Sequence, residues 1–303
     1  MWMDNMIEKI KRLVKEKNAV ILAHNYQPPE IQDLADLCGD SLELSIKAAD
    51  TDADIIVFCG VQFMAETASI LSPDKQVLLP AADAGCPMAD MVTPQALKAK
   101  KAELGNIPVV TYVNSTAAVK ALSDICCTSA NAVDVVNSLE SSELLMIPDR
   151  NLARYAAANS SKTIHLWEGF CPYHDTLTKA DVEKVRKKYP DAVFMAHPEC
   201  PPVVLEMADA VESTSGMLRF ANASDKKEFI VGTEVGLIYP LSQQNPDKRF
   251  YPASEKMYCR DMKKIGLADI VTSLENGTGE IKVPESVRKD ALKAVQRMIA
   301  LKR

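Results

Sequence analysis

The sequence predicts an α/β fold made of three repeats of one unit, each an αβα sandwich around a short parallel sheet. The first observation is that three series of polar residues recur at nearly one stride, with separations of 88 or 85 residues. The second is that short apolar runs recur beside each series in the same order. Nearly continuous apolar runs are typical of parallel strands buried on both faces. The three series are His24, Tyr112 and His197; Ser41, Ser129 and Thr214; and Cys86, Cys171 and Cys259.

Four runs define the strands of each repeat. The first ends at an imidazole or a tyrosine, and the second leads from an aspartate to a hydroxyl residue. The third contains no polar side chain, and the fourth leads from a lysine to a cysteine. We expect a helix to begin at each final hydroxyl residue and right-handed crossovers to join the strands. The runs span 20–24, 36–41, 55–58 and 75–86 in the first repeat, 109–112, 124–129, 144–147 and 162–171 in the second, and 193–197, 209–214, 229–232 and 248–259 in the third.

The repeats also set the predicted domain boundaries. Apolar and charged residues alternate at helical spacing near both ends of the chain, which predicts amphipathic helices that flank the repeats. Units of roughly 85 residues are smaller than most domains, so we expect them to support one another. The predicted units are a first repeat with an N-terminal helix in 1–106, a second repeat in 107–190, a third in 191–262, and a C-terminal helical segment packing on the repeats in 263–303.

The composition excludes several classes of protein. The chain has 303 residues, 47% of them hydrophobic, and a formal net charge of −6 without a basic stripe, which argues against a nucleic-acid partner. No apolar run approaches the roughly 18 residues that span a bilayer, and the N-terminus lacks the apolar core of a signal peptide. We therefore expect a cytoplasmic protein without a membrane partner, in which the eight cysteines are reduced.

Three cysteines are candidate metal ligands. Cys86, Cys171 and Cys259 follow the fourth run of each repeat, in loops at the carboxyl ends of strands, where α/β domains build their sites. Three converging thiolates suit zinc or an iron–sulfur cluster. A four-iron cluster held by three cysteines would leave one iron open to a substrate oxygen, as a Lewis acid for elimination of water. The sequence has no Cys-x-x-Cys pair, which disfavours zinc ribbons and dithiol redox motifs.

The other cysteines are interpreted differently. Cys38, Cys59 and Cys126 lie within apolar runs and are expected to be core thiols. Cys127 and Cys200 lie near the predicted site but outside the periodic series, and the sequence assigns them no role.

The remaining two series predict a site for a small polyanion. Hydroxyl residues at helix N-caps, with free backbone N–H groups beside them, receive carboxylates or phosphate. The first strands end in triplets with polar first and third members, whose side chains would point the same way in an extended chain. Glu199 is the candidate general base, with tyrosines and histidines as acids and hydrogen-bond donors. The triplets are HNY at 24–26, YVN at 112–114 and HPE at 197–199.

Six segments resemble the quinolinate synthase family, the A-type enzymes of bacterial and archaeal NAD biosynthesis, and the resemblance covers essentially the whole chain. They are AHNY at 23–26, GCPMAD at 85–90, YVN at 112–114, GFCPYH at 169–174, AHPEC at 196–200 and STSGM at 213–217.

The resemblance implies an architecture and a reaction. The architecture is three αβα domains in pseudo-threefold arrangement around one [4Fe–4S] cluster per chain. The reaction condenses iminoaspartate (iminosuccinate) with dihydroxyacetone phosphate to quinolinate, with loss of phosphate and two waters, in de novo NAD biosynthesis. It also implies a functional link to the enzyme that supplies iminoaspartate.

The resemblance further assigns residues. Cys86, Cys171 and Cys259 are the implied cluster ligands. Some relatives carry Cys-x-x-Cys-x-x-Cys at the last ligand, but here Cys259 is followed by Arg-Asp-Met, so a disulfide switch of that kind is not available. The implied substrate contacts are His24, Ser41, Tyr112, Asn114, Ser129, His197, Glu199 and Thr214. The implied catalytic residues are Glu199, Tyr26, Tyr112, His24, His197 and His174.

Two other functions stay open on the sequence. An aconitase-type hydro-lyase would share the open iron, and product analysis would separate it. A metal or redox sensor would need neither Glu199 nor three anion sites, so binding of a dicarboxylate analogue would argue against it.

Overall fold

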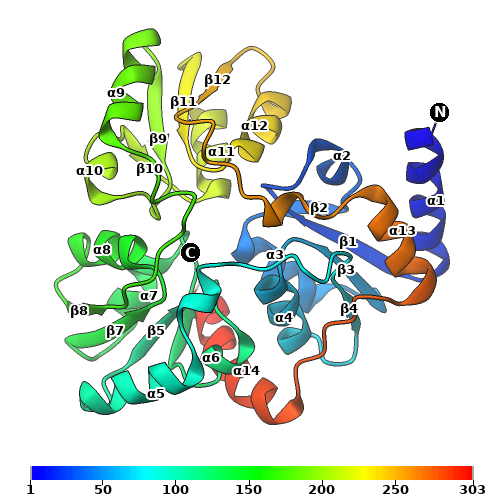
Figure 1. Cartoon of the computed structure of the whole chain (residues 1–303), viewed down its shortest axis with the longest axis horizontal. Coiled ribbons are helices and arrows are strands. Elements are labelled where there is room, and N and C mark those ends of the chain that lie inside the picture. Colours follow the sequence, from blue (N-terminus) through cyan, green and yellow to red (C-terminus); the bar gives the residue numbers. More distant parts are fainter. Residues whose placement is uncertain (1, 302–303) are drawn as a thin grey trace.

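The computed structural model describes residues 2–301 and arranges the chain as three α/β repeats around a common centre (Figure 1). Each repeat contains one four-stranded sheet, and its strands are all parallel. The strand order is the same three times: the second strand lies at one edge, followed by the first, the third and the fourth. The predicted fold class, α/β with three repeated αβα units, is therefore confirmed.

The strands overlap the apolar runs that predicted them, because central strands covered on both faces have no polar side to interrupt the run. No edge strand is longer than four residues, and the third repeat has a second strand of only two residues. The strands are β1 (Ala19–His24), β2 (Leu37–Gly39), β3 (Ile55–Cys59) and β4 (Gln76–Leu78); β5 (Val109–Tyr112), β6 (Ile125–Cys127), β7 (Glu143–Ile147) and β8 (Thr163–Leu166); and β9 (Val193–Ala196), β10 (Ala210–Val211), β11 (Glu228–Gly232) and β12 (Arg249–Pro252).

The aspartate that begins each second run ties two strands together. In the first repeat, Asp36 Oδ2 accepts the backbone N–H of Ile21 in β1 at 2.8 Å. The same bond recurs in the other repeats at the same distance, which explains why the aspartate returns with the repeat. The equivalent pairs are Asp124 with Val109 and Asp209 with Phe194.

The lysine that begins each fourth run binds backbone carbonyls that precede the third strand. In the third repeat, Lys248 Nζ donates to Ala221 O at 2.5 Å and to Ser224 O at 2.8 Å, at the C-terminal end of a helix. A cation is favourable there because the last carbonyls of a helix lack partners and carry partial negative charge. Lys75 and Lys162 make the corresponding contacts in the other two repeats.

The helices alternate with the strands. A one-turn helix follows the first strand of every repeat, and longer helices follow the second and third strands. The α-helices are α1 (Trp2–Glu16), α2 (Pro29–Gln32), α3 (Ser41–Asp50), α4 (Gln62–Leu71), α5 (Pro94–Glu103), α6 (Ala117–Lys120), α7 (Ala132–Ser138), α8 (Arg150–Ala158), α9 (Lys179–Lys188), α10 (Pro202–Leu205), α11 (Thr214–Ala223), α12 (Ile238–Gln244), α13 (Leu267–Asn276) and α14 (Glu285–Ala300), and the 3₁₀ turns are η1 (Ala89–Met91), η2 (Val235–Leu237) and η3 (Asp261–Lys263).

The two ends of the chain pack back onto the repeats. Helix α1 lies against β1 and α13 on the first repeat. Helix α14 contacts α4 of the first repeat and both α6 and β6 of the second, so it bridges two sheets (Figure 1). The domain boundaries drawn after residues 106, 190 and 262 stay predictions. Within residues 2–301, no helix is long and apolar enough to cross a membrane.

The expected helix starts need one correction. Helices α3 and α11 begin at Ser41 and Thr214 as predicted, but α7 begins at Ala132, three residues after Ser129. Asn131 explains the delay: its side-chain oxygen accepts the N–H of Thr128 at 2.7 Å and closes a turn there.

The predicted N-cap role is also wrong for the hydroxyl series. Asp40 caps α3 by accepting from two backbone N–H groups, and Ser213 caps α11 by accepting the N–H of Gly216 at 3.2 Å. Because the preceding residue does the capping, the hydroxyls of Ser41 and Thr214 remain available for other contacts.

Candidate functional site

Two adjoining cavities lie where the three repeats meet. We call the first the thiol cavity; its empty volume, with open solvent at the mouth included, is about 490 Å³, and Cys86, Cys171 and Cys259 line it. We call the second the polar cavity; its empty volume on the same measure is about 400 Å³. The wall between them is shared, which makes the two cavities parts of one site. The shared residues are Tyr26, Phe63, Asn114, Glu199 and Met262.

All predicted substrate contacts line the polar cavity. The three repeats contribute to it in turn, since the first strand and the following hydroxyl residue of each repeat both reach it. These residues are His24, Ser41, Tyr112, Asn114, Ser129, His197, Glu199 and Thr214. Of the predicted catalytic residues, Tyr26 and Glu199 reach both cavities, and His174 lines the thiol cavity.

The three cavity cysteines share one local geometry. In each, the backbone N–H of the residue three positions later points at the sulfur, which favours the thiolate. Burial dominates nevertheless: it raises the pKa of Cys86 to about 12 and that of Cys259 to about 11, and it raises the pKa of Cys171 well above the ordinary value. These sulfurs would therefore become thiolates only with a compensating cation in the cavity.

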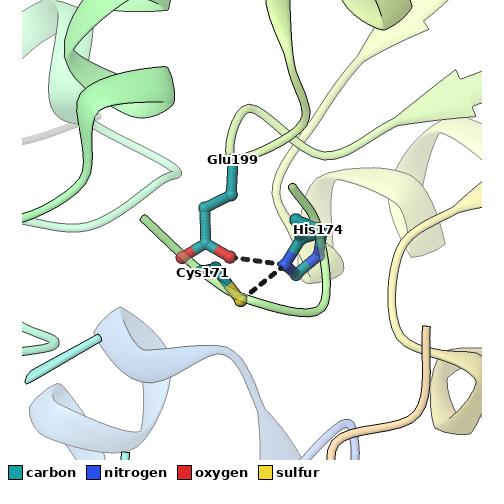
Figure 2. Close-up of side chains that lie close together, drawn as sticks. All are labelled: Cys171, His174 and Glu199. Carbon is teal, nitrogen blue, oxygen red and sulfur yellow. Dashed lines mark hydrogen bonds and ion pairs between the residues drawn. The ribbon is translucent and has the colours of Figure 1, made fainter. Parts of the chain in front are cut away.

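The cysteine sulfurs are not clustered tightly enough for one small ion. Among the described residues, only Cys171, His174 and Glu199 form a group of three whose ligand atoms all lie within 4.8 Å of one another (Figure 2). A single zinc ion bonds each sulfur at about 2.3 Å, so it would draw three thiolates closer than this. Three sulfurs around one larger cavity suit a cluster of several metal ions better than one ion.

His174 is already bonded within that close group. Its Nδ1 lies 2.7 Å from Glu199 Oε2 and 3.2 Å from Cys171 Sγ (Figure 2). Its Nε2 lies 2.8 Å from the hydroxyl of Thr233, which in turn lies 2.5 Å from the hydroxyl of Tyr26. These contacts form a continuous hydrogen-bonded path from Glu199 to Tyr26, so acid–base function explains the group without a metal ion on His174.

Glu199 is set up as a buried base. Burial by itself raises its pKa, but His174 and His197 outweigh this and lower the pKa to about 2. His197 Nδ1 lies 3.6 Å from the same carboxylate oxygen, Oε2. A hydrogen bond from the phenol of Tyr112 to the carboxylate also lowers its pKa. The other oxygen, Oε1, makes no close hydrogen bond among the described residues, and neither does the buried Asn114 Oδ1. Buried acceptors without donors are rare, so both indicate a ligand that donates to them.

Two histidines are held as neutral rings in the same tautomer. Burial lowers the pKa of His24 to about 3, with a further contribution from Lys263, and burial likewise lowers the pKa of His197 to about 3. In each ring Nδ1 accepts the N–H of the residue two positions on, at 3.2 Å in His24 and 3.3 Å in His197. The proton therefore lies on Nε2, which in His197 faces Ser129 Oγ at 3.1 Å.

These bonds correct the expected geometry of the triplets. The chain after His24 and after His197 is a turn and not an extended strand, closed in each case by a bond from the N–H of the third following residue. The turn still brings His24 and Tyr26, and likewise His197 and Glu199, to the same cavity.

The tyrosines are phenols rather than phenolates. Burial raises the pKa of Tyr26 and of Tyr112 well above the ordinary value, and the negative charge of Glu199 raises both further. Both hydroxyls can therefore donate hydrogen bonds at neutral pH.

The remaining cysteines lie outside both cavities. Cys59, Cys126, Cys127 and Cys200 are fully buried, and the sulfur of Cys200 donates to Gly232 O. Cys38 is only half-buried, and its sulfur donates to Gln32 O at 3.3 Å.

Sequence reasoning missed Thr233, which joins Tyr26 to His174. No periodic signal could have found it, because the equivalent residues of the second and first repeats are Pro148 and Gly60, which carry no hydroxyl. It also missed Phe63 and Met262, which are apolar and lie in the wall between the cavities.

A buried acid–base network beside three convergent thiols, at the junction of three α/β repeats, places the protein among α/β enzymes with a central site shared by repeated domains.

Comparison with known proteins defines the family. A family model described as quinolinate synthetase A protein matches residues 8–300. The chain is 54% identical over 303 residues, all of both chains, to the quinolinate synthase of Geotalea uraniireducens (strain Rf4) and to that of Geobacter sp. (strain M21). It is 52% identical over 297 residues, 98% of both chains, to the quinolinate synthase of Methanosarcina barkeri (strain Fusaro / DSM 804). The chain belongs to the quinolinate synthetase A family and is an enzyme of that kind.

Proposed function

We propose that this enzyme condenses iminoaspartate with dihydroxyacetone phosphate to quinolinate, releasing phosphate and two waters, in de novo NAD biosynthesis. The observation that carries the proposal is the polar cavity, because every residue expected to contact the substrate lines it. The relatives named quinolinate synthase match the chain over its full length, which supports the same reaction here.

We further propose that Cys86, Cys171 and Cys259 hold one [4Fe–4S] cluster per chain. The donor set fits: one sulfur from each repeat lines a common cavity, and the raised pKa values of these thiols call for a cation. When bound, such a cluster supplies a Lewis-acidic iron without a protein ligand, which polarises a substrate oxygen.

The polar cavity is suited to a dicarboxylate. Ser41 and Thr214 lie in the first turns of α3 and α11, where the helix dipole favours anions, while Asp40 and Ser213 accept the N–H groups of Leu42, Glu43 and Gly216. The neutral imidazoles of His24 and His197 add Nε2–H groups, which can donate hydrogen bonds to the carboxylates of iminoaspartate. These donors are uncharged, and the carboxyl groups of Asp40 and Glu199 line the same cavity.

The acid–base groups divide the proton transfers. Glu199 is ionised at neutral pH and its Oε1 makes no close hydrogen bond, so this oxygen is placed to accept a proton from substrate. His174 and Thr233 connect Glu199 to the hydroxyl of Tyr26, so a proton can pass along this path. The phenols of Tyr26 and Tyr112 remain protonated and can donate to a departing hydroxyl group.

Burial protects the substrate. Imines hydrolyse in water, so the site should exclude it. The exposed fraction is 5% or less for each of four residues that line the polar cavity: His24, Tyr112, His197 and Glu199. We also propose a functional link to the enzyme that supplies iminoaspartate, because a short transfer limits loss of the imine to hydrolysis.

The test is anaerobic reconstitution with iron and sulfide, followed by counting of both and by a quinolinate assay with the two substrates. We expect about four irons and four sulfides per chain and quinolinate as product. A reconstituted cluster with no quinolinate would contradict the proposed reaction. Hydration of a carboxylic acid substrate instead would favour an aconitase-type enzyme.

A further inference from the structure

A fourth series of residues recurs at the same separations as the polar series of the site. Its first member is apolar, so a comparison of polar residues alone does not find it. Two residues beyond the third strand of each repeat stand Val61, Asp149 and Glu234. Their separations are those of the histidine and hydroxyl series. Both acidic residues are almost completely buried. A buried carboxylate needs donors, and both of these have the backbone N–H of a cavity cysteine.

Asp149 has two functions. Its Oδ1 accepts the N–H of Leu152 at 2.7 Å and so caps helix α8. Its Oδ2 accepts the N–H of Cys171 at 2.9 Å. One carboxylate therefore fixes both the start of a helix and the main chain of a cysteine.

Glu234 repeats this arrangement in the third repeat. Its Oε2 accepts from the N–H of Gly236 at 2.8 Å, at the start of η2, and from Lys263 Nζ at 2.9 Å. Its Oε1 accepts the N–H of Cys259 at 3.0 Å. Two side chains of different length thus make the same pair of bonds at equivalent positions.

The first repeat provides an internal comparison. In all three repeats the residue after this position donates its N–H to the carbonyl two residues before the cysteine, at 2.8, 2.8 and 2.9 Å. The main chain therefore runs in the same register each time. Val61 is the N-cap residue of α4 and makes no side-chain cap, and its side chain has no atom that can accept an N–H from Cys86. The fold of this corner does not require a carboxylate, so a role in capping alone does not account for Asp149 and Glu234.

We propose that Asp149 and Glu234 are positioning residues that fix the main chain of Cys171 and Cys259 so that both sulfurs face the thiol cavity in the geometry of cluster ligands. The inference rests on the proposed function, in which these cysteines bind a cluster. Groups that orient ligands in this way typically change metal affinity about 10- to 100-fold when they are removed.

The test separates ligand positioning from helix capping. Serine caps helices as well as aspartate does but has a single oxygen, so Asp149→Ser keeps the cap and loses the bond to Cys171. Glu234→Gln keeps one acceptor oxygen and turns an NH₂ group toward a donor. The control is Thr178→Val, which removes the side-chain cap of helix α9 at a residue that lines neither cavity.

Each protein is reconstituted anaerobically, and the loss of cluster absorption to an iron chelator is timed. The Tm of each metal-free chain is measured alongside. We expect cluster loss to be about 10- to 100-fold faster in Asp149→Ser and Glu234→Gln than in the unchanged chain. Thr178→Val should lower Tm and leave the rate of cluster loss within about twofold.

The outcomes distinguish this inference from the proposed function. If both variants lose the cluster at the rate of the unchanged chain, the positioning role is wrong while the proposed cofactor stands. If the unchanged chain binds no cluster, the proposed cofactor fails and the inference fails with it. If Asp149→Ser does not fold, Asp149→Asn, which also keeps one acceptor oxygen for the cap, is measured in its place under the same criteria.

Discussion

At the residue scale, the site works through groups whose ionisation is set by burial and by their neighbours. Glu199 stays charged in the interior chiefly because His174 bonds its carboxylate, whereas His24 and His197 stay neutral because burial outweighs the attraction of Glu199. The lowered pKa of Glu199 keeps its carboxylate ionised at neutral pH, so it is available to accept a proton from the substrate.

The role of Glu199 leads to a direct prediction. Glu199→Gln keeps the shape of the side chain but removes its basicity, so turnover to quinolinate should fall by about 10²- to 10⁴-fold. The absorption spectrum of the reconstituted cluster should be unchanged, because Glu199 is not one of the proposed ligands. Glu183→Gln, on the exposed face of α9, is the matched control. Turnover within about twofold of the unchanged chain would exclude Glu199 as the base.

The buried histidines predict the pH dependence of stability in the metal-free chain. The unfolded chain binds protons on His24 and His197 near pH 6.5, but the folded chain binds them only near pH 3. The free energy of unfolding should therefore fall as pH falls through this window, by up to about 1.4 kcal/mol per pH unit for each histidine. Glu199, with its lowered pKa, acts in the same direction between about pH 4.5 and pH 2.

Urea unfolding at pH 7, 6 and 5 measures this effect. His24→Gln should remove about half of the change between pH 6 and pH 5. A free energy of unfolding that stays constant from pH 7 to pH 5 would show that the two rings are not held neutral in the folded chain.

Much of the candidate site could be predicted from single residues, because the repeat placed equivalent side chains in register. The cysteines, the hydroxyls and the strand-end histidines all reach the cavities as expected. Thr233, Asp149 and Glu234 could not be found in this way. Thr233 has no counterpart in the other repeats, and the Asp149 series begins with a valine, so a search for recurring polar residues passes over both.

At the scale of elements, the strands were predictable and the short helices were not. A central strand covered on both faces leaves an apolar run, and each of the twelve predicted runs overlaps one strand, although the edge strands β8, β10 and β12 are only partly buried. The helices α2, α6 and α10 are single turns, too short to show a helical period. The only sequence signals are the proline pairs at 28–29 and 201–202, which mark the starts of α2 and α10.

The aspartates that begin the second runs allow a test at this scale. Asp36→Ala removes the acceptor for the N–H of Ile21, which is then left buried between two strands. The free energy of unfolding of the metal-free chain should fall by about 1–3 kcal/mol, measured by urea titration at pH 7. Asp36→Asn retains an acceptor oxygen and should lose less. Equal losses in the two variants would show that the bond to Ile21 is not the source of stability.

At the scale of the whole molecule, no repeat can form the site alone. The polar cavity takes side chains from every repeat, and the hydroxyl of Ser129 in the second bonds to His197 in the third. The sequence could predict which residues are equivalent, but not how closely they approach, because that depends on packing between repeats. The separation of the cysteine sulfurs, which disfavours a single ion, was visible only in the structure.

This assembly predicts how the eight cysteines divide. Changing Cys86, Cys171 or Cys259 to alanine removes the ligand of an entire repeat, and two thiolates should not retain a stable four-iron cluster. Each of these variants should therefore lack the cluster absorption and hold far less than four irons per chain after anaerobic reconstitution. Cys59→Ala and Cys126→Ala should keep the cluster and lose about 1 kcal/mol of stability from packing.

Cys127 and Cys200 test how the cluster ligands are selected. The ligands are either the cysteines at equivalent positions of the three repeats or any cysteines close in sequence to residues of the site. Both lie close in sequence to residues of the polar cavity, yet both are buried outside the two cavities. Alanine at either position should therefore leave iron content and quinolinate turnover near those of the unchanged chain. A Cys200→Ala protein without cluster, or an active Cys259→Ala protein that retains it, would overturn the ligand assignment, because the cavity would then not be the place where the three repeats jointly bind metal.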